Sequence, residues 1–141
     1  MKRFKKIVYI LDEKTIDSDT SARKVASLAR LNEAEITPVF YDDTKFDDEV
    51  AFSFLKQRTD SLREEFESQC SEKLQSFFTT DHWEDIKVKD NYLVFSDFVS
   101  VIQKVIAEKS DLVILEDLTE QGLNQLAMRL VRKCPCPVWI I

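Results

Sequence analysis

The stretch "KIVYIL", residues Lys6 to Leu11, is a short run of apolar and β-branched residues that Asp12 and Glu13 bring to an end. A strand that is buried on both faces shows such a run of consecutive apolar residues, without the alternation of a half-exposed strand. We therefore expect Lys6–Leu11 to be an interior strand of a parallel sheet.

Strand-like runs alternate with segments of helical periodicity along the rest of the chain. The further strands are expected at Glu35–Tyr41, Ile86–Tyr92, Asp111–Leu115 and Pro137–Ile141. The apolar stripes of the four helices between them are Ala22, Val25, Ala26 and Ala29; Phe54, Leu62, Phe66, Cys70, Leu74 and Phe78; Phe98, Ile102 and Val105; and Leu123, Leu126, Ala127 and Leu130. The expected N-caps are Asp17, Ser18 or Asp19 for the first helix and Ser96-Asp97 for the third. This order predicts an α/β fold, a parallel doubly wound sheet with helices on both faces.

The composition is that of one domain over residues 1–141, because 44% of the residues are hydrophobic and no linker or repeat interrupts them. The net charge of −6 argues against a nucleic-acid partner, because such binding needs clustered Lys and Arg and here the acidic residues outnumber the basic ones. No apolar run reaches membrane length, and the basic start of the chain has too short an apolar stretch for a signal peptide. With three cysteines in no disulfide pattern, we expect a cytoplasmic protein.

The sequence resembles the universal stress protein family along nearly its whole length. The segments that carry the resemblance are "KKIVYILD", "SARKVASLARLNEAEITPVFYDD", "SDLVIL" and "RLVRKCPCPVWII". The last of these looks most like the first domain of tandem-domain members. The resemblance implies a five-stranded sheet of order 3-2-1-4-5. It also leaves two interpretations of the chain, a single-domain protein or the N-terminal half of a tandem protein.

Many members of this family bind ATP between the first and fourth strands, through a glycine signature that follows the fourth strand. Glycine lets backbone N–H groups approach the phosphates closely, and a helix N-terminus adds partial positive charge. Here Gly122, the sole glycine of the chain, falls on one signature position. Thr119 stands at the first glycine of the signature, Asn124 and Gln125 stand where Gly-Ser would be, and the spacer has shrunk to Leu123. The sequence therefore predicts a degenerate nucleotide loop.

Acidic residues reinforce this prediction. Glu116, Asp117 and Glu120 would lie near the phosphate positions, where like-charge repulsion outweighs the attraction of a helix dipole. What the resemblance leaves of a nucleotide pocket is Asp12 at the end of the first strand and Val39, where the family contacts adenine through backbone. We therefore expect no cofactor, with ATP or AMP held at Asp12, Val39 and Gly122 as the alternative.

No motif predicts catalytic or metal chemistry. Cys134 and Cys136 could share a metal with His82 and Cys70 only, and Cys70 lies in an apolar stripe. We predict that both cysteines are reduced and metal-free, and we interpret His82 as a loop residue. The acidic run Tyr41–Glu49 lacks the glycine and the spacing of an EF-hand, so we interpret it as a solvated loop.

The resulting hypothesis is a universal stress protein domain without enzymatic activity, acting as a dimerising or regulatory module in a stress response. The alternative is a nucleotide-binding sensor for ATP or AMP that uses a non-standard loop, and a third interpretation is a redox or metal module at Cys134 and Cys136. The final strand would be a sheet edge, and a bare apolar edge is a template for pairing. We therefore expect Val138, Trp139 and Ile140 to form the interface with a second copy or a second domain of the same kind.

Overall fold

The computed structural model describes residues 3–12, 15–16, 19–41, 56–90, 92–95, 97–116 and 125–141, with only the backbone described for residues 56–63 and 125. Several predictions concern residues whose placement lies outside these ranges or whose side chains are not described. They are the helix caps Asp17, Ser18 and Ser96, the stripe residues Phe54, Leu62 and Leu123, the acidic run after Tyr41, and the loop that contains Gly122.

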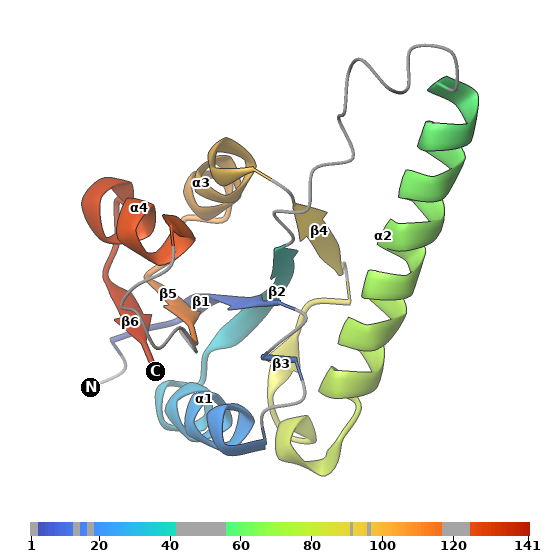
Figure 1. The fold of residues 1–141 in the computed structure, drawn as a ribbon. Coiled ribbons are helices and arrows are strands. Elements are labelled where there is room, and N and C mark those ends of the chain that lie inside the picture. Colours follow the sequence, from blue (N-terminus) through green and yellow to red (C-terminus); the bar gives the residue numbers. More distant parts are fainter. Residues whose placement is uncertain are drawn as a thin grey trace.

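Strands and helices alternate as predicted (Figure 1). The elements are β1 (Lys6–Leu11), α1 (Asp19–Asn32), β2 (Glu35–Tyr41), α2 (Lys56–Phe78), the 3-10 helix η1 (Asp81–Trp83), β3 (Lys87–Val88), β4 (Leu93–Phe95), α3 (Phe98–Ala107), β5 (Leu112–Leu115), α4 (Gln125–Lys133) and β6 (Val138–Ile140). In the described part of the chain, no helix is long and apolar enough to span a membrane.

The sheet has the order β3–β2–β1–β5–β6, and β4 also pairs with β2. Every pairing is parallel. If β3 and β4 are counted as one interrupted strand, this is the predicted order 3-2-1-4-5. The parallel α/β fold expected from the sequence is therefore confirmed.

The third strand is the part of the sheet that the sequence predicted wrongly. Instead of one strand over Ile86–Tyr92, β3 pairs with the start of β2 and β4 pairs with its end. The sequence between them contains Asp90-Asn91, and these residue types favour turns over strand ladders. The backbone N–H of Lys89 still donates a hydrogen bond to the carbonyl of Ile36 in β2 at 2.9 Å. The strand is therefore interrupted after Lys89.

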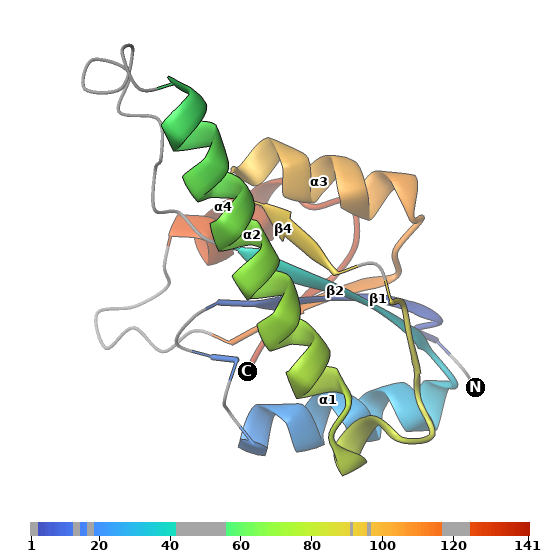
Figure 2. The same cartoon turned by 90° about the vertical axis from the view of Figure 1, so that its right-hand side faces the viewer.

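Side chains of the central strands alternate between two cores. Figures 1 and 2 show α3 and α4 on one face of the sheet and α1 on the other, with α2 beside β2 and β4. On β1, Tyr9 points into the core with α1 and α2, whereas Val8 and Ile10 point into the core with α3 and α4. The predicted helix stripes supply both cores, and Cys70 is buried in α2 as expected, with 2% of its surface exposed.

A cluster of three charged residues joins the interrupted strand to α3. Glu108, which caps the C-terminus of α3, accepts a hydrogen bond from Lys104 Nζ at 2.7 Å and another from Lys89. These hydrogen bonds lower the pKa of the Glu108 carboxyl to about 2. Because the folded state favours the ionised carboxylate, the stabilisation is present above the unfolded pKa of about 4.3 and is lost as the pH falls toward 2.

We therefore predict that Glu108→Gln lowers the free energy of unfolding by about 1 kcal/mol at pH 7, the upper range for partly exposed ion pairs. The difference from the wild type should shrink as the pH falls from 5 to 2, as measured by urea denaturation at each pH. Glu67→Gln, at an exposed position of α2 outside the cluster, is the control. A difference that stayed constant with pH would contradict this role of Glu108.

Candidate functional site

The carboxyl ends of β1 and β5 form the switch point of the sheet. β1 and β5 are neighbours in the sheet. The strand that follows β1 in the sequence, β2, lies on one side of this pair, and the strand that follows β5, β6, lies on the other. In open parallel sheets, ligands bind in the crevice beyond the carboxyl ends of such strands. Asp12 follows β1 and Glu116 follows β5, so both residues lie at this crevice.

Asp12 closes the turn that leads from β1 toward α1. Its Oδ1 accepts a hydrogen bond from the backbone N–H of Thr15 at 2.9 Å, and its own N–H donates to Thr15 Oγ1 at 2.9 Å. The carbonyl of Asp12 accepts from the N–H of Ile16 at 3.0 Å. The aspartate predicted from the family resemblance is thus at the expected place, where its carboxylate holds the backbone of the turn.

Glu116 links the end of β5 to the first turn of α1. The hydroxyl of Ser21 donates to Glu116 Oε2 at 2.6 Å, across 95 residues of sequence. Ser21 is buried and Glu116 is half-buried. Negative charge near a helix N-terminus is stabilised by the partial positive charge of the helix dipole. A carboxylate of the protein itself therefore occupies the N-terminal end of α1 at the crevice.

Tyr9 lies in β1, close enough to Glu116 for an electrostatic interaction with its carboxylate. Burial, and secondarily the charge of Glu116, raise the pKa of the Tyr9 phenol, so the hydroxyl is neutral. Its ring packs edge-to-face on Phe78 with a centroid distance of 6.1 Å. Neither the Tyr9 hydroxyl nor Trp83 Nε1 has a hydrogen-bond partner within the described part of the chain. Both polar atoms are fully enclosed in the aromatic core beneath α2.

Val39, the other predicted pocket residue that the structure describes, has no exposed surface. It lies in β2 between β1 and β4, and its side chain belongs to the core with α3 and α4. Any contact of Val39 with a ligand therefore requires a change in the packing around it. The third predicted pocket residue, Gly122, lies outside the described residues.

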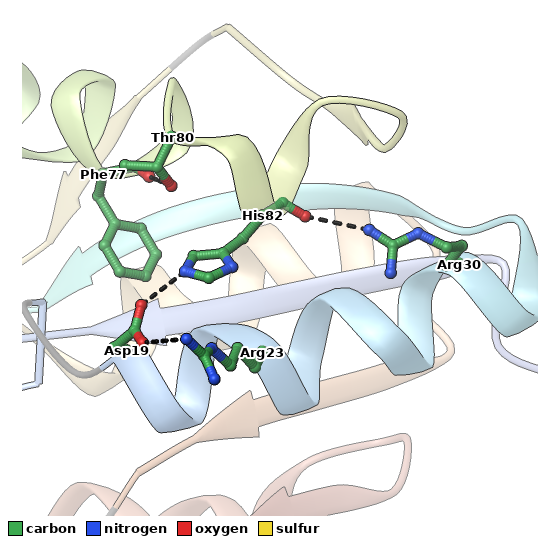
Figure 3. Close-up of polar contacts among 6 residues, drawn as sticks. All are labelled: Asp19, Arg23, Arg30, Phe77, Thr80 and His82. Carbon is green, nitrogen blue, oxygen red and sulfur yellow. Dashed lines mark hydrogen bonds and ion pairs between the residues drawn. The ribbon is translucent and has the colours of Figure 1, made fainter.

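His82 was predicted to be a loop residue, but it lies in η1 and contacts a carboxylate. Figure 3 shows its ring pointing toward Asp19, and the distance from Nε2 to Asp19 Oδ1 is 2.5 Å. Asp19 also pairs with Arg23 at 3.1 Å. Arg30 donates hydrogen bonds to the carbonyl of His82 at 3.2 Å and to both carboxylate oxygens of Asp85, which follows η1. These contacts attach η1 to α1.

Cys134 and Cys136 lie side by side in the passage from α4 to β6. Their Sγ atoms are 3.7 Å apart, and both residues are half-buried against the core with α3 and α4. Burial, with the neighbouring Cys134 thiol, raises the pKa of Cys136 to about 12, which disfavours the reactive thiolate. Among the described residues, no group of three or more His, Cys, Asp or Glu side chains is placed to hold a metal ion.

Two of these contacts, Ser21 with Glu116 and His82 with Asp19, were not predicted from the sequence. Ser21 carries a weak signal, because it is a polar residue in the first turn of a helix on the side that also carries buried alanine. Asp19 was singled out only as a helix cap. Neither residue is tied to its partner by any motif, because the partners lie 95 and 63 residues away.

No protein-family model and no curated protein matches this sequence. Solved structures do match over nearly the whole chain. The hypothetical protein MJ0577 aligns at a TM-score of 0.75 and 17% identity, covering 99% of this chain and 96% of that chain. The universal stress protein UspA from Lactobacillus plantarum aligns at a TM-score of 0.64 and 17% identity, covering 99% and 98%.

Similar structures of this kind were solved with nucleotides. The universal stress protein from Archaeoglobus fulgidus in complex with dAMP aligns at a TM-score of 0.57 and 14% identity, covering 99% of this chain and 98% of that chain. Other universal stress protein structures hold cAMP and, in Arabidopsis thaliana, AMP, at TM-scores of 0.55 and 0.51. The resemblance seen in the sequence is confirmed at the level of structure, and this chain has the fold of the universal stress proteins.

Proposed function

We propose that this protein is a universal stress protein domain that acts as a dimerising or regulatory module in a stress response, without binding ATP and without enzymatic activity. The observation that carries the proposal is the hydrogen bond between Ser21 and Glu116. It holds a carboxylate at the crevice beyond the carboxyl ends of β1 and β5, where open parallel sheets bind their ligands. We also propose a cytoplasmic location, from the sequence features given above.

The electrostatics of the crevice support the absence of ATP binding. A phosphate that approached Glu116 to about 4 Å would be repelled by about 1 kcal/mol per pair of charges even in water, and by more in a partly buried site. The dipole of α1 could offset only about 0.3–1 kcal/mol. Because the repulsion increases with the negative charge of the ligand, it would be strongest for a triphosphate.

The second candidate is a sensor that binds an adenine nucleotide. The structures with dAMP, AMP and cAMP support it, because their fold is that of this chain over nearly its whole length. A monophosphate carries less charge than ATP and would suffer less from Glu116. Binding would then involve Asp12 and Val39, and Val39 would have to become accessible.

The edge strand β6 supports the dimerising role. Among the described strands it pairs with β5 alone, and its residues Val138, Trp139 and Ile140 are half-buried. Their side chains alternate between the two cores, and among the described strands the backbone edge opposite β5 has no partner. A second copy related by a two-fold axis would cover this edge.

We predict that millimolar Mg-ATP leaves the melting temperature unchanged. Ligand at 100 times its Kd would stabilise the fold by about 2.7 kcal/mol, which thermal denaturation detects easily. AMP measured in parallel tests the second candidate. An upward shift with either nucleotide that Asp12→Ala abolishes would replace the proposed function by the sensor.

The link between Ser21 and Glu116 should also contribute to stability. Ser21→Ala removes the donor from a half-buried carboxylate, and we expect a loss of about 1–3 kcal/mol in the free energy of unfolding, measured with urea. Glu116→Gln keeps an acceptor for the hydroxyl and should cost less. Ser27→Ala, on the exposed side of α1, serves as the matched control. Equal effects of the two serine variants would show that the hydrogen bond contributes nothing.

We further predict a dimer at micromolar concentration in light scattering, which the double substitution Val138→Lys with Trp139→Glu converts to a monomer. Circular dichroism checks that the variant stays folded, since both side chains also touch the core. Leu31→Glu is the control, because Leu31 on α1 is the most exposed large apolar side chain described. A monomeric wild type, or a folded double variant that is still dimeric, argues against the β6 interface.

A further inference from the structure

A cleft of about 800 Å³ lies between α1 and the C-terminal half of α2, and His82 of η1 also lines it. This volume lies within the range of small-molecule sites. Its lining includes neither Asp12, Val39 nor Glu116, so it is separate from the crevice at the end of the sheet.

The inner part of the cleft is apolar and fixed in position. Ile16 and Ala22 line it and are 5% and 1% exposed. The half-buried ring of Phe77 lines it as well, and Figure 3 shows this ring next to Asp19 and His82. Phe77 packs on Phe78 and Trp83 with centroid distances of 4.9 and 5.7 Å. An apolar group that entered the cleft would therefore meet a rigid aromatic surface.

The α2 wall carries polar side chains without partners. Gln69, Glu72 and Ser76 follow one another at helical spacing along this wall. Within the described residues, the structure shows no hydrogen bond or ion pair for the side chains of these three residues. The carboxylate of Glu72 is therefore available to a ligand at the cleft.

The α1 wall contributes a second carboxylate. Asp19 lines the cleft and already attracts two cationic or hydrogen-bonding groups, His82 and Arg23. Lys73 also lines the cleft, but it is engaged in an interaction of its own. The cleft thus holds two carboxylates, of which Glu72 is unpaired within the described residues, beside an aromatic ring whose face attracts cations.

We propose that this cleft binds a small organic cation, an ammonium or guanidinium group carried on an apolar body. The cationic group lies at Glu72, with Asp19 across the cleft, and donates to these carboxylates. The apolar body packs on Phe77, Ile16 and Ala22. Gln69 and Ser76 provide further hydrogen bonds along the α2 wall.

The test is a titration of the isotope-labelled protein with phenethylammonium chloride, followed by amide chemical shifts in NMR spectra. We expect saturable shifts at Ala22, Ser76 and Phe77. The neutral analogue 2-phenylethanol should bind at least about fivefold more weakly, because it lacks the charge that pairs with Glu72. AMP added separately should leave these three amides unchanged.

Two variants decide whether Glu72 holds the cation. Glu72→Gln keeps the shape of the side chain and should weaken phenethylammonium binding by about fivefold. Glu65→Gln, on an exposed part of the same helix outside the cleft, should leave it unchanged. The proposal is overturned if no saturable shifts occur at the cleft, if the neutral analogue binds equally well, or if the two variants weaken binding equally.

Discussion

The burial of β1 on both faces is the constraint on which the rest of the structure depends. Successive residues of this strand enter different cores, Tyr9 toward α1 and α2 and Ile10 toward α3 and α4. A strand that buries every side chain needs a layer of helices on each side, and parallel crossovers provide those layers. Aspartate side chains bind backbone N–H groups at both ends of this strand. Asp111 accepts from the N–H groups of Lys5 and Lys6 where β1 begins, and Asp12 forms the turn where it ends.

The periodicity of the sequence was sufficient to predict the layers, but not every boundary. Runs of apolar residues and apolar stripes of helical spacing mark the residues that are buried. For this reason four of the five strands were predicted at or within about one residue of their observed positions. The third strand failed because its halves pair with different parts of β2, and tertiary pairing decided its limits. The C-terminal ends of α1 and α3 were not predicted, because no glycine marks them in the sequence. Glu33 and Lys109 follow α1 and α3 with φ of 50° and 51°, positions that glycine usually marks.

The sequence analysis named a residue of the crevice but none of its contacts. Asp12 was chosen from the family resemblance, and in the structure it follows β1 at the carboxyl edge of the sheet. The bond between Ser21 and Glu116 and the pair of His82 with Asp19 depend on how α1 packs against β5 and η1. The spacing of residues within one element carries no information about that packing. A lone histidine therefore looked like a loop residue, although its partner is a residue in the first turn of a distant helix.

The strand β5 connects the two features that a regulatory role would use. Its last residue, Leu115, pairs with Ile140 of β6, and the next residue is Glu116 of the crevice. Adjacent strands lie about 4.8 Å apart, so one strand separates the crevice from the edge. A ligand at Glu116 and a partner on β6 would both act on the position of β5. Coupling between sites requires an element that both binding events bias. In the proposed regulatory module that element would be β5, which the hydrogen bond between Glu116 and Ser21 attaches to α1.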